Sequence, residues 1–497
     1  MKDWLRLRPY IHISPRLGCK SKKRTKHYVT TYVNDSENLA IHRFSPLLHY
    51  KIVDHRYKRD GSKKLESGKI GRAYKVKIRP IYYANHLDAQ IFAFYADKIN
   101  KRLQEIYESD INLSNSVIGY RAIQSNARRN KCTIDFAREV FEFISNHKEH
   151  HISVVCLDIA SFFDNLNHSV LKSAWGRLFE QVLLSKEDYQ VFKAITRPYY
   201  IDLEELIPLL PDFDKRSLNL VNKSKRASLF DSFQQFRSIV YSNKLLRKYG
   251  GSNNGEKGIP QGTPISAVLS NLYFLQSDIE ILKITSPLEG LYRRYSDDIL
   301  LICPTDQVEN VIKTVKDIIE RQLSLKIQDD KTIIANLTRS SPTDSWTINA
   351  TNSKGQTVGQ SIGYLGFEFD GSRIRIRNSS ISKYYRGLKR AIRRRAFYAK
   401  VQLEKNKLSN VKEDDWIFRA GIFRKKTHLG AKRKKIDGRV FWGNYISYVK
   451  NAGHVMGDTH MKSINRQVRN HWKIVANEIE RHEKRYGLPK APKSKNS

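Results

Sequence analysis

Runs of apolar residues with strand-like or helical spacing recur along this chain. Residues 75–84, KVKIRPIYYA, alternate as in a strand, whereas residues 88–107 carry apolar side chains at the spacing of an amphipathic helix. The runs 27–33 and 43–53 are also strand-like, and 58–71 has the charge and glycine content of an exposed loop. The pattern therefore predicts an α+β fold.

The first candidate site residue in the chain is Asp158. It directly follows the run 152–157, whose continuous apolar character predicts a strand buried on both faces. A charge at the end of a buried strand is costly, and a chain tolerates that cost where the charge is used. A helix is expected from about His168, and for Asp164 we favour the role of a helix N-terminal cap.

The segment 291–303, LYRRYSDDILLIC, predicts a hairpin with two adjacent acids, Asp297 and Asp298, at its turn. Clustered carboxylates that face an open cleft commonly hold a divalent metal ion. Aspartate is also a favoured turn residue. The hairpin alone therefore leaves a metal site and a plain turn equally open.

A loop rich in glycine and proline precedes a helix that is expected to begin near Ser266. Gly258 and Gly262 allow the backbone to approach a ligand closely. Gln261 lies between them and can hydrogen-bond a base or a sugar. As an isolated feature, this loop is a weak signal of function.

Three further segments follow the acidic hairpin. An amphipathic helix at 308–323 leads to a short predicted strand and then to Lys331. Residues 361–370 predict a second hairpin, with Gly366 at its bend. Beyond it the chain becomes helical and strongly basic, with aromatic residues between the cations, a composition that suits a nucleic-acid backbone as well as helix packing.

The net charge of the chain is +39, which makes nucleic acid the first partner to consider. A membrane surface would also attract such a charge, but no run approaches the roughly 20 apolar residues that a membrane span needs. The four cysteines are scattered without metal-ligand spacing, which fits a reducing compartment. We therefore expect a cytoplasmic protein with no membrane association.

Three acids at the ends of neighbouring strands, Asp158, Asp297 and Asp298, could together bind two Mg²⁺ ions. Two such ions about 3.5–4 Å apart activate a 3′-hydroxyl and neutralise the leaving pyrophosphate. The arrangement therefore indicates nucleotidyl transfer.

The order of these motifs resembles the palm of bacterial reverse transcriptases. Asp158 with the aromatic Phe163 is similar to motif A, and Gly258-Ile259-Pro260-Gln261-Gly262 is similar to motif B. Tyr295-Ser296-Asp297-Asp298 matches the YxDD of motif C, with serine where alanine is usual. The resemblance implies a right-hand polymerase, with fingers and palm built on antiparallel sheet and followed by an α-helical basic thumb.

The same resemblance implies roles for individual residues. Lys331 lies where the motif D lysine is expected, as a candidate general acid for pyrophosphate. Phe163 occupies the position that excludes ribonucleotides, which implies that the substrates are dNTPs. The other implied contacts are Arg121 for the triphosphate with Arg79 as a second candidate, Gln261 and Gly262 for the incoming nucleotide, Tyr364 and Gly366 for the primer, and Arg393 and Arg394 for the nucleic-acid backbone.

We divide the chain by this resemblance into an N-terminal basic extension, fingers and palm with a mostly helical insertion, a helical basic thumb or RNA-binding region, and a disordered tail. The corresponding residues are 1–71, 72–370 with the insertion at 183–254, 371–489 and 490–497.

The segments WLRLRPYIHIS and RPIYYANHLDAQIFAFYA are similar to defence-associated reverse transcriptases of the abortive-infection and "unknown group" class, of type 2 or type 9. That likeness implies anti-phage immunity, a noncoding RNA partner as template or scaffold, and a repetitive or homopolymeric cDNA product. It also implies a homo-oligomer and, in some relatives, priming from a protein hydroxyl. Two alternatives stay open: an RNA-binding scaffold with a structural palm, and a retron or group II intron enzyme.

Overall fold

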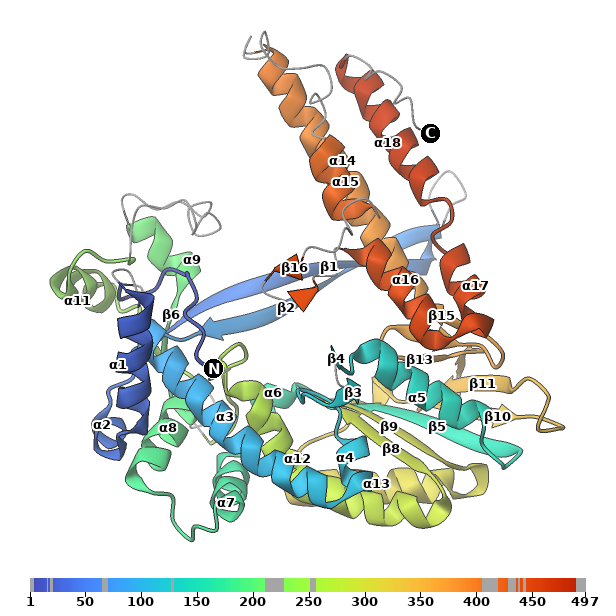
Figure 1. Ribbon diagram of the computed structural model, residues 1–497, viewed down its shortest axis with the longest axis horizontal. Helices are drawn as coiled ribbons and strands as arrows, with labels where there is room; N and C mark the ends of the chain where they lie inside the picture. The colour runs from blue at the N-terminus through green and yellow to red at the C-terminus, as the bar shows by residue number, and fades with distance from the viewer. Residues whose placement is uncertain are drawn as a thin grey trace. The chain divides into compact units, whose positions relative to one another are not determined.

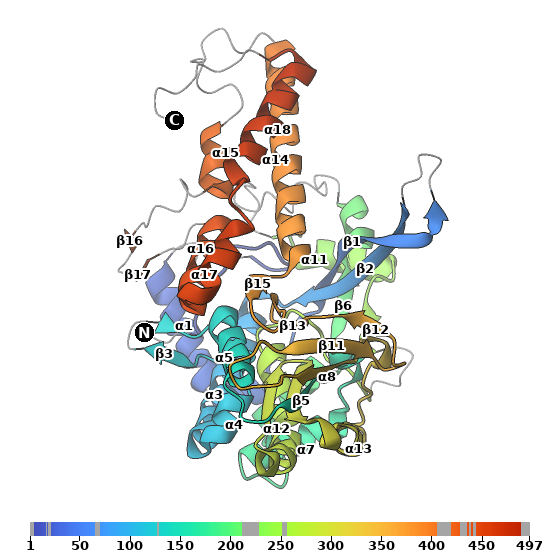
Figure 2. The same cartoon turned by 90° about the vertical axis from the view of Figure 1, so that its right-hand side faces the viewer.

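Figure 1 shows the computed structural model of the chain, and Figure 2 shows the same ribbon turned by 90°. The structure describes residues 4–15, 17, 21–64, 70–126, 129–210, 228–250, 256–404, 419–427, 435–436, 439–440 and 444–488.

The chain forms two compact units, each assembled from separate segments. The first unit comprises 1–121, 156–303 and 307–332, and the second comprises 122–155, 304–306 and 333–497. The predicted tail at 490–497 lies outside the described residues.

The first unit has several helices that pack around the central helix α12. Its elements are α1 (Lys22–Asn34), α2 (Ser36–Ile41), β1 (Leu47–Lys64), β2 (Ile70–Tyr83), α3 (His86–Ser109), α4 (Ile111–Ser116), α6 (Phe162–Asn165), α7 (His168–Leu178), α8 (Lys186–Thr196), β6 (Tyr199–Asp202), α9 (Leu203–Leu206), η1 (Ile207–Leu209), α11 (Phe233–Ser242), β7 (Arg247–Lys248), α12 (Ser266–Thr285), η3 (Ser286–Leu288), β8 (Leu291–Tyr295), β9 (Asp298–Pro304), α13 (Val308–Leu323) and η5 (Asp329–Lys331).

The second unit contains the remaining elements. They are β3 (Gln124–Asn126), β4 (Arg129–Asn130), α5 (Thr133–Ser145), β5 (His151–Asp158, whose last three residues belong to the first unit), η4 (Thr305–Gln307), β10 (Ile333–Thr338), β11 (Thr347–Asn352), β12 (Thr357–Gly359), β13 (Ile362–Tyr364), β14 (Phe367–Phe369), β15 (Ile374–Ile376), α14 (Asn378–Glu404), α15 (Arg419–Lys426), β16 (Lys435–Ile436), β17 (Arg439–Val440), α16 (Tyr445–Met456), α17 (Asp458–Arg466) and α18 (His471–Tyr486).

Two sheets position the first unit's functional segments. A four-stranded sheet has the order β2-β1-β6-β7, in which β1 and β2 form a long antiparallel hairpin and β6 runs parallel to β1. The end of β5 lies beside β9, and β9 pairs with β8. Helix α12 packs against α3, α7 and α13, so its apolar surface is buried on several sides (Figure 1).

The second unit combines short strands with basic helices. Strands β10, β11 and β12 continue from β5 in the order β12-β11-β10-β5, and β13, β14 and β15 form a separate antiparallel sheet. Helices α14 and α18 run side by side in both views and enclose a core that includes Leu388, Ile392 and Val475. This apolar seam supports the cations on the outer faces of both helices.

Most of the elements predicted from apolar spacing are confirmed. Strand β5, the hairpin β8–β9, and the starts of α7 and α12 agree with the sequence pattern. The hairpin of β13 and β14 bends at Gly366, whose φ of 90° suits glycine.

The prediction of a strand at 27–33 is wrong, because these residues form part of α1. Ser21 caps the helix by accepting a hydrogen bond from the Arg24 amide. Val29 and Val33, four residues apart, are buried on one helical face. The β-branched residues in this run suggested a strand, but burial selected the helical period.

Two further local predictions are corrected. Asp164 does not cap a helix, since it lies within α6, and α7 is capped by Asn167, which accepts from the Ser169 and Val170 amides. The exposed loop predicted at 58–71 is wrong in part, because β1 continues to Lys64 and β2 begins at Ile70.

The insertion at 183–254, predicted to be mostly helical, contains α8, α9, η1 and α11 together with β6 and β7, which extend the sheet of β1 and β2. Residues 211–227 and 251–254 of this insertion lie outside the described part.

Candidate active site

The β8–β9 turn presents two carboxylates at the open end of a buried hairpin. Tyr295 pairs with Asp298, so Ser296 and Asp297 form the two-residue turn. Ser296 has a φ of 61° and is buried, whereas Asp297 is half-buried and Asp298 is exposed. Strand β9 is buried from Ile299 to Cys303, so the two acids are held at the end of a buried apolar strand.

Asp158 ends β5, the strand that neighbours β9 in the sheet. Its carbonyl accepts a hydrogen bond from the Gln328 amide at 2.7 Å, which fixes the backbone beside η5. Its carboxylate Oδ1 lies 2.7 Å from the Nζ atom of Lys331. The structure thus brings together two predicted site residues that lie 173 positions apart in the sequence.

The chemistry of Asp158, Asp297 and Asp298 suits a hard divalent cation, because such ions prefer carboxylate oxygen. Among the described residues, however, no three His, Cys, Asp or Glu side chains are grouped closely enough to hold a metal ion. The Lys331 ammonium occupies one position where a cation would contact Asp158. The three-aspartate metal site therefore stays a prediction, and forming it requires Asp158 to exchange Lys331 for metal.

The glycines of the predicted motif B loop are required by close backbone packing. A Cβ atom on Gly258 would lie 2.8 Å from the Asp164 carbonyl oxygen, and one on Gly262 would lie 2.6 Å from that of Tyr82. Both glycines have positive φ values, 90° and 115°. The Gln261 carbonyl accepts from the Tyr82 amide at 2.8 Å, which joins the loop to β2.

Phe163 lies beside the same loop. Its carbonyl accepts a hydrogen bond from the Ile259 amide at 2.8 Å, and its half-buried ring packs against Phe162 at 5.1 Å between centroids. Phe162 is buried and contacts Phe274 of α12. The predicted sugar-screening ring is therefore supported by the core and adjoins the loop that carries Gln261.

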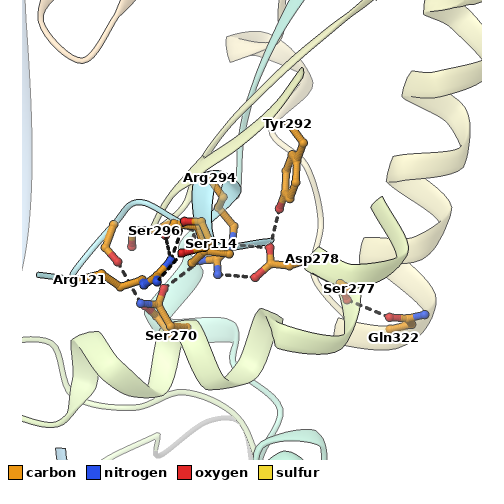
Figure 3. Close-up of polar contacts among 12 residues, drawn as sticks. Ser114, Arg121, Ser270, Ser277, Asp278, Tyr292, Arg294, Ser296 and Gln322 are labelled. Carbon is orange, nitrogen blue, oxygen red and sulfur yellow. Dashed lines mark hydrogen bonds and ion pairs between the residues drawn. The ribbon is translucent and has the colours of Figure 1, made fainter. Parts of the chain in front are cut away.

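Arg121 is engaged by the protein itself (Figure 3). Its Nη1 atom donates to the carbonyls of Ser114 and Val117 at 2.8 and 2.7 Å, and its Nη2 atom donates to Gln104 and Ser114 side chains. The guanidinium also lies 4.0 Å from the Tyr107 ring centroid. Its role as a triphosphate ligand stays a prediction, which would require the side chain to give up some of these bonds.

A network that the sequence did not reveal lies directly beneath the acidic turn. Arg294 and Asp278 are both fully buried and form an ion pair with 2.6 Å between Nη2 and Oδ2 (Figure 3). Burial by itself would lower the pKa of Arg294, but the Asp278 carboxylate outweighs burial and raises that pKa above its ordinary value. The sequence signals for this pair were Asp278 on the largely apolar helix α12 and Arg294 within a strand.

The predicted primer contacts lie in the second unit. Tyr364 is buried at the end of β13, and Gly366 follows Leu365 in the turn to β14. The Gly366 carbonyl accepts from the Arg377 amide at 2.9 Å. The turn is therefore well anchored.

Arg393 and Arg394 are both exposed on α14, but they differ in surroundings. Arg394 helps to line a pocket of about 280 Å³ between α14 and α15, whereas Arg393 does not. The pocket's charged lining residues are all cations: Arg390, Arg394, Arg395, Lys425 and Lys426. Such a site suits phosphate groups.

A larger pocket of about 820 Å³ adjoins the motif B loop at Gly262 and Pro264. Its wall includes Arg6 and a stacked pair of rings, Tyr10 and His86, at 4.5 Å between centroids. Cations and aromatic rings together suit a nucleotide. The sequence could not reveal this pocket because its lining comes from segments far apart in the chain.

The helices of the described part include none that is both long and apolar enough to cross a membrane. No curated protein sequence is similar enough to this chain to count as a match.

Several solved structures of telomerase are similar to parts of this chain. Apo telomerase from Candida tropicalis truncated from its C-terminal domain is 12% identical with a TM-score of 0.35, covering 70% of this chain and 59% of that one. Telomerase from Candida albicans in complex with a TWJ fragment of telomeric RNA is 13% identical with a TM-score of 0.35, covering 92% and 66%. This chain spans less than two thirds of the length of either, and such scores are too low to assign an activity or a partner.

The family model described as reverse transcriptase (RNA-dependent DNA polymerase) matches residues 77–369, which is more than half of the chain. This match confirms the reverse transcriptase resemblance and the α+β polymerase fold that the motif order predicted. The protein belongs to the reverse transcriptase family, whose domain is that of a nucleotidyltransferase.

Proposed function

We propose that this protein is an RNA-directed DNA polymerase that copies a noncoding RNA into cDNA from dNTPs as part of bacterial antiviral defence. The observation that carries the polymerase proposal is the placement of Asp158 at the end of β5, the neighbour of the strand that begins at Asp298. The loop that carries Gln261 lies in the same unit. Its Ile259 amide donates a hydrogen bond to the carbonyl of Phe163, the second residue of α6.

In this proposal Asp158, Asp297 and Asp298 hold two Mg²⁺ ions. When bound, such ions supply the positive charge that favours attack by a 3′-hydroxyl and stabilises the leaving pyrophosphate. The turn conformation keeps both hairpin acids at the accessible end of β9, so no strand rearrangement is needed to present them.

Lys331 has the role of a proton donor to the leaving pyrophosphate. Its side chain is half-exposed and its Nζ atom is bound to Asp158, so the ammonium can reach the site in which the phosphates react. When Asp158 binds metal, the released ammonium becomes available to donate its proton. The proposal thus gives Lys331 two successive partners.

Substrate selection is assigned to the residues around the motif B loop. Phe163 screens the sugar 2′ carbon and excludes ribonucleotides, and Gln261 with Gly262 contacts the incoming nucleotide. The triphosphate is assigned to Arg121, with the half-buried Arg79 of β2 as the second candidate.

The nucleic-acid strands are assigned to the second unit. Tyr364 and Gly366 contact the primer, while Arg393 and Arg394 contact the phosphate backbone. The cationic pocket that Arg394 lines supports this assignment, because five positive side chains close together repel one another unless an anion is bound.

The polymerase proposal is tested by incubating purified protein and its co-purifying RNA with dNTPs and Mg²⁺. Asp297→Ala and Asp298→Ala should abolish incorporation, with a loss of roughly 10³-fold or more, about 4 kcal/mol in the barrier. Equal incorporation by the wild type and both variants would refute the site. RNA binding without any incorporation would favour the scaffold alternative.

The defence role, the noncoding RNA and a homopolymeric or repetitive product rest on the resemblance of the N-terminal segments. Sequencing of the bound RNA and of the DNA product tests all three. A branched RNA–DNA product would instead indicate a retron enzyme, and a flanking catalytic intron would indicate an intron enzyme.

Protein priming and a homo-oligomer belong to the same proposal. DNA that stays attached to the protein after denaturation would support protein priming, and light scattering of the purified RNA complex would give the oligomeric state. If the Asp297→Ala variant protects cells against phage as well as the wild type does, defence does not need DNA synthesis.

The backbone contacts are tested by RNA retention over a range of salt concentrations. Replacement of Arg393 and Arg394 together by alanine should weaken retention and flatten its salt dependence, by roughly 0.7–0.9 in slope for each lost phosphate contact. Lys389→Ala, which removes a cation that pairs with Glu478 on α18, is the matched control on the same helix.

A further inference from the structure

The buried network beneath the acidic turn has no role in the substrate contacts described above. Asp278 of α12 accepts from the Nε and Nη2 atoms of Arg294 at 2.7 and 2.6 Å, and from the Tyr292 hydroxyl at 2.5 Å. Figure 3 shows these three side chains converging between the helix and the hairpin. The Arg294 guanidinium also lies 4.6 Å from the Phe274 ring centroid. Its position and orientation are therefore fixed from several sides.

One atom of Arg294 links this network to the acidic turn. Its Nη1 atom donates to the Ser296 carbonyl at 3.3 Å and to the Asn271 side chain at 3.2 Å. The Ser296 carbonyl belongs to the peptide group that leads into Asp297. Because Ser296 has a left-handed φ of 61°, which is uncommon for a residue other than glycine, its conformation depends on such tertiary support.

The main chain of Arg294 adds a second restraint. Its carbonyl accepts hydrogen bonds from the amides of Ile118 and Gly119 at 3.0 and 3.3 Å. A Cβ atom on Gly119 would lie only 2.7 Å from the Ser296 nitrogen, so this backbone packs directly on the turn. The Asn271 side chain donates to the Gly119 carbonyl at 2.9 Å, which ties this segment to α12 as well.

The physical chemistry of buried ion pairs indicates what this network supplies. Taking two charges out of water costs several kcal/mol for each ion, and well-packed apolar residues often stabilise a fold equally well. The distinctive contribution of an arginine is instead a rigid planar fork that bonds in several fixed directions at once. Here the fork holds Asp278 on one side and the Ser296 carbonyl on the other.

We propose that Arg294, oriented by Asp278, is a positioning residue that fixes the Ser296 peptide and thereby the direction of the Asp297 carboxylate. Arg294 is buried and acts only through the turn. Its effect on DNA synthesis rests on the proposed polymerase function, whereas its effect on the turn does not.

The turn is examined directly by amide hydrogen exchange of the purified protein without substrates. Arg294→Lys keeps the charge but cannot bond both Asp278 oxygens and the Ser296 carbonyl together. We expect exchange to become at least about tenfold faster in 117–119 and 294–299, with α13 unchanged. Tyr292→Phe, which removes one hydrogen bond to Asp278, should produce a smaller change in the same segments.

Two variants on α12 serve as controls. Ser277→Ala removes a hydrogen bond to Gln322 of α13, and Ile281→Val removes a buried methyl group from the core. Both lie within three residues of Asp278, yet neither side chain bonds to Arg294. Ile281→Val lowers the stability of the fold without changing a contact of the turn. Amide hydrogen exchange of residues 294–299 in this variant should therefore stay at the level of the wild type.

Steady-state kinetics of DNA synthesis separate positioning from simple support. Arg294→Lys should lower kcat by roughly 10²-fold, since an error of about 1 Å in the placement of a reacting group has an effect of that size. The KM for dNTP and the affinity for RNA should change by less than about twofold, and Ile281→Val should leave kcat near that of the wild type.

The outcomes distinguish this proposal from the polymerase proposal. Faster exchange confined to the turn with unchanged kcat would overturn the positioning role, as would unchanged exchange in Arg294→Lys. If the wild type makes no DNA, the polymerase proposal fails and the exchange data still decide whether Arg294 fixes the turn. If Arg294→Lys does not fold, Tyr292→Phe supplies both measurements.

Discussion

Two ion pairs of nearly equal length have opposite surroundings in the first unit. Arg294 and Asp278 lie 2.6 Å apart with both side chains fully buried, whereas Lys331 and Asp158 lie 2.7 Å apart with side chains 49% and 24% exposed. Distance therefore does not distinguish them, but exposure does. Separating the buried charges would leave each one with neither water nor an opposite charge to stabilise it, while water can replace either exposed partner.

This difference suits two separate tasks. The buried pair has fixed geometry and contacts the turn that carries Asp297. The exposed pair can open, which allows Asp158 to accept a metal ion and Lys331 to approach a phosphate. We infer that the candidate site combines a permanent scaffold with an exchangeable pair of charges.

The largest expected effect is on stability, when the buried pair is broken. Arg294→Met leaves Asp278 buried without its cation, and we expect the free energy of unfolding to fall by about 3–5 kcal/mol. Urea denaturation followed by circular dichroism measures this change. Lys331→Met, by the same method, should cost less than about 1 kcal/mol. Similar losses in the free energy of unfolding for the two variants would contradict the proposed difference between the buried and the exposed ion pair.

The next effect concerns the rate of DNA synthesis. Lys331→Met should lower the rate of nucleotide addition by roughly 10²-fold, as expected for loss of a general acid. Single-turnover incorporation at saturating dNTP measures the step. Lys316→Met is the matched control, because Lys316 forms a similarly exposed pair with Asp329 that lies outside the proposed site. Equal rates for Lys331→Met and the wild type would remove the proposed proton donor.

A third prediction concerns the buried, titratable side chain of His12. His12 is fully buried beside His86 and Tyr10, its Nε2 atom lies 3.2 Å from the Tyr83 carbonyl, and burial lowers its pKa from 6.5 to about 3. Because only the unfolded state binds a proton below pH 6.5, stability is complete above that pH and falls as the pH drops. The loss should be about 2 kcal/mol between pH 6.5 and 5.

His12→Gln should remove this pH dependence, since glutamine cannot take up a proton. The exposed His27→Gln serves as the control and should retain it. Urea titrations at pH 5, 6 and 7 measure the three proteins. An unchanged slope with pH in His12→Gln would mean that another group titrates.

The smallest predicted effect is at Ser296. Its hydroxyl is buried, and within the described part of the chain it has no hydrogen-bond partner. Ser296→Ala removes that polar atom and should raise the free energy of unfolding by up to about 1 kcal/mol without changing the rate of DNA synthesis. Thermal denaturation and the incorporation assay measure both. A loss of activity would show that the hydroxyl has a functional partner.

The sequence alone was informative where a single element carries the signal. The acids between the run that ends at Tyr295 and the apolar run that begins at Ile299 placed the hairpin, and the apolar run before Asp158 placed β5. Side-chain direction repeats every two residues in a strand and every 3.6 in a helix, so burial on one face is visible in the residue order. In residues 27–33 of α1, where β-branched residues are frequent, the residue order was misleading.

By itself, then, the sequence determined the order of motifs, the glycines of the loop and the acids at the ends of strands, because each depends on residues close together in the chain. Only the tertiary structure decided that Asp278 pairs with Arg294, that Lys331 reaches Asp158 and that Arg121 is bonded to its own unit. The strength and permanence of an ion pair depend on how much water the surrounding elements exclude, and no local pattern of residues specifies that.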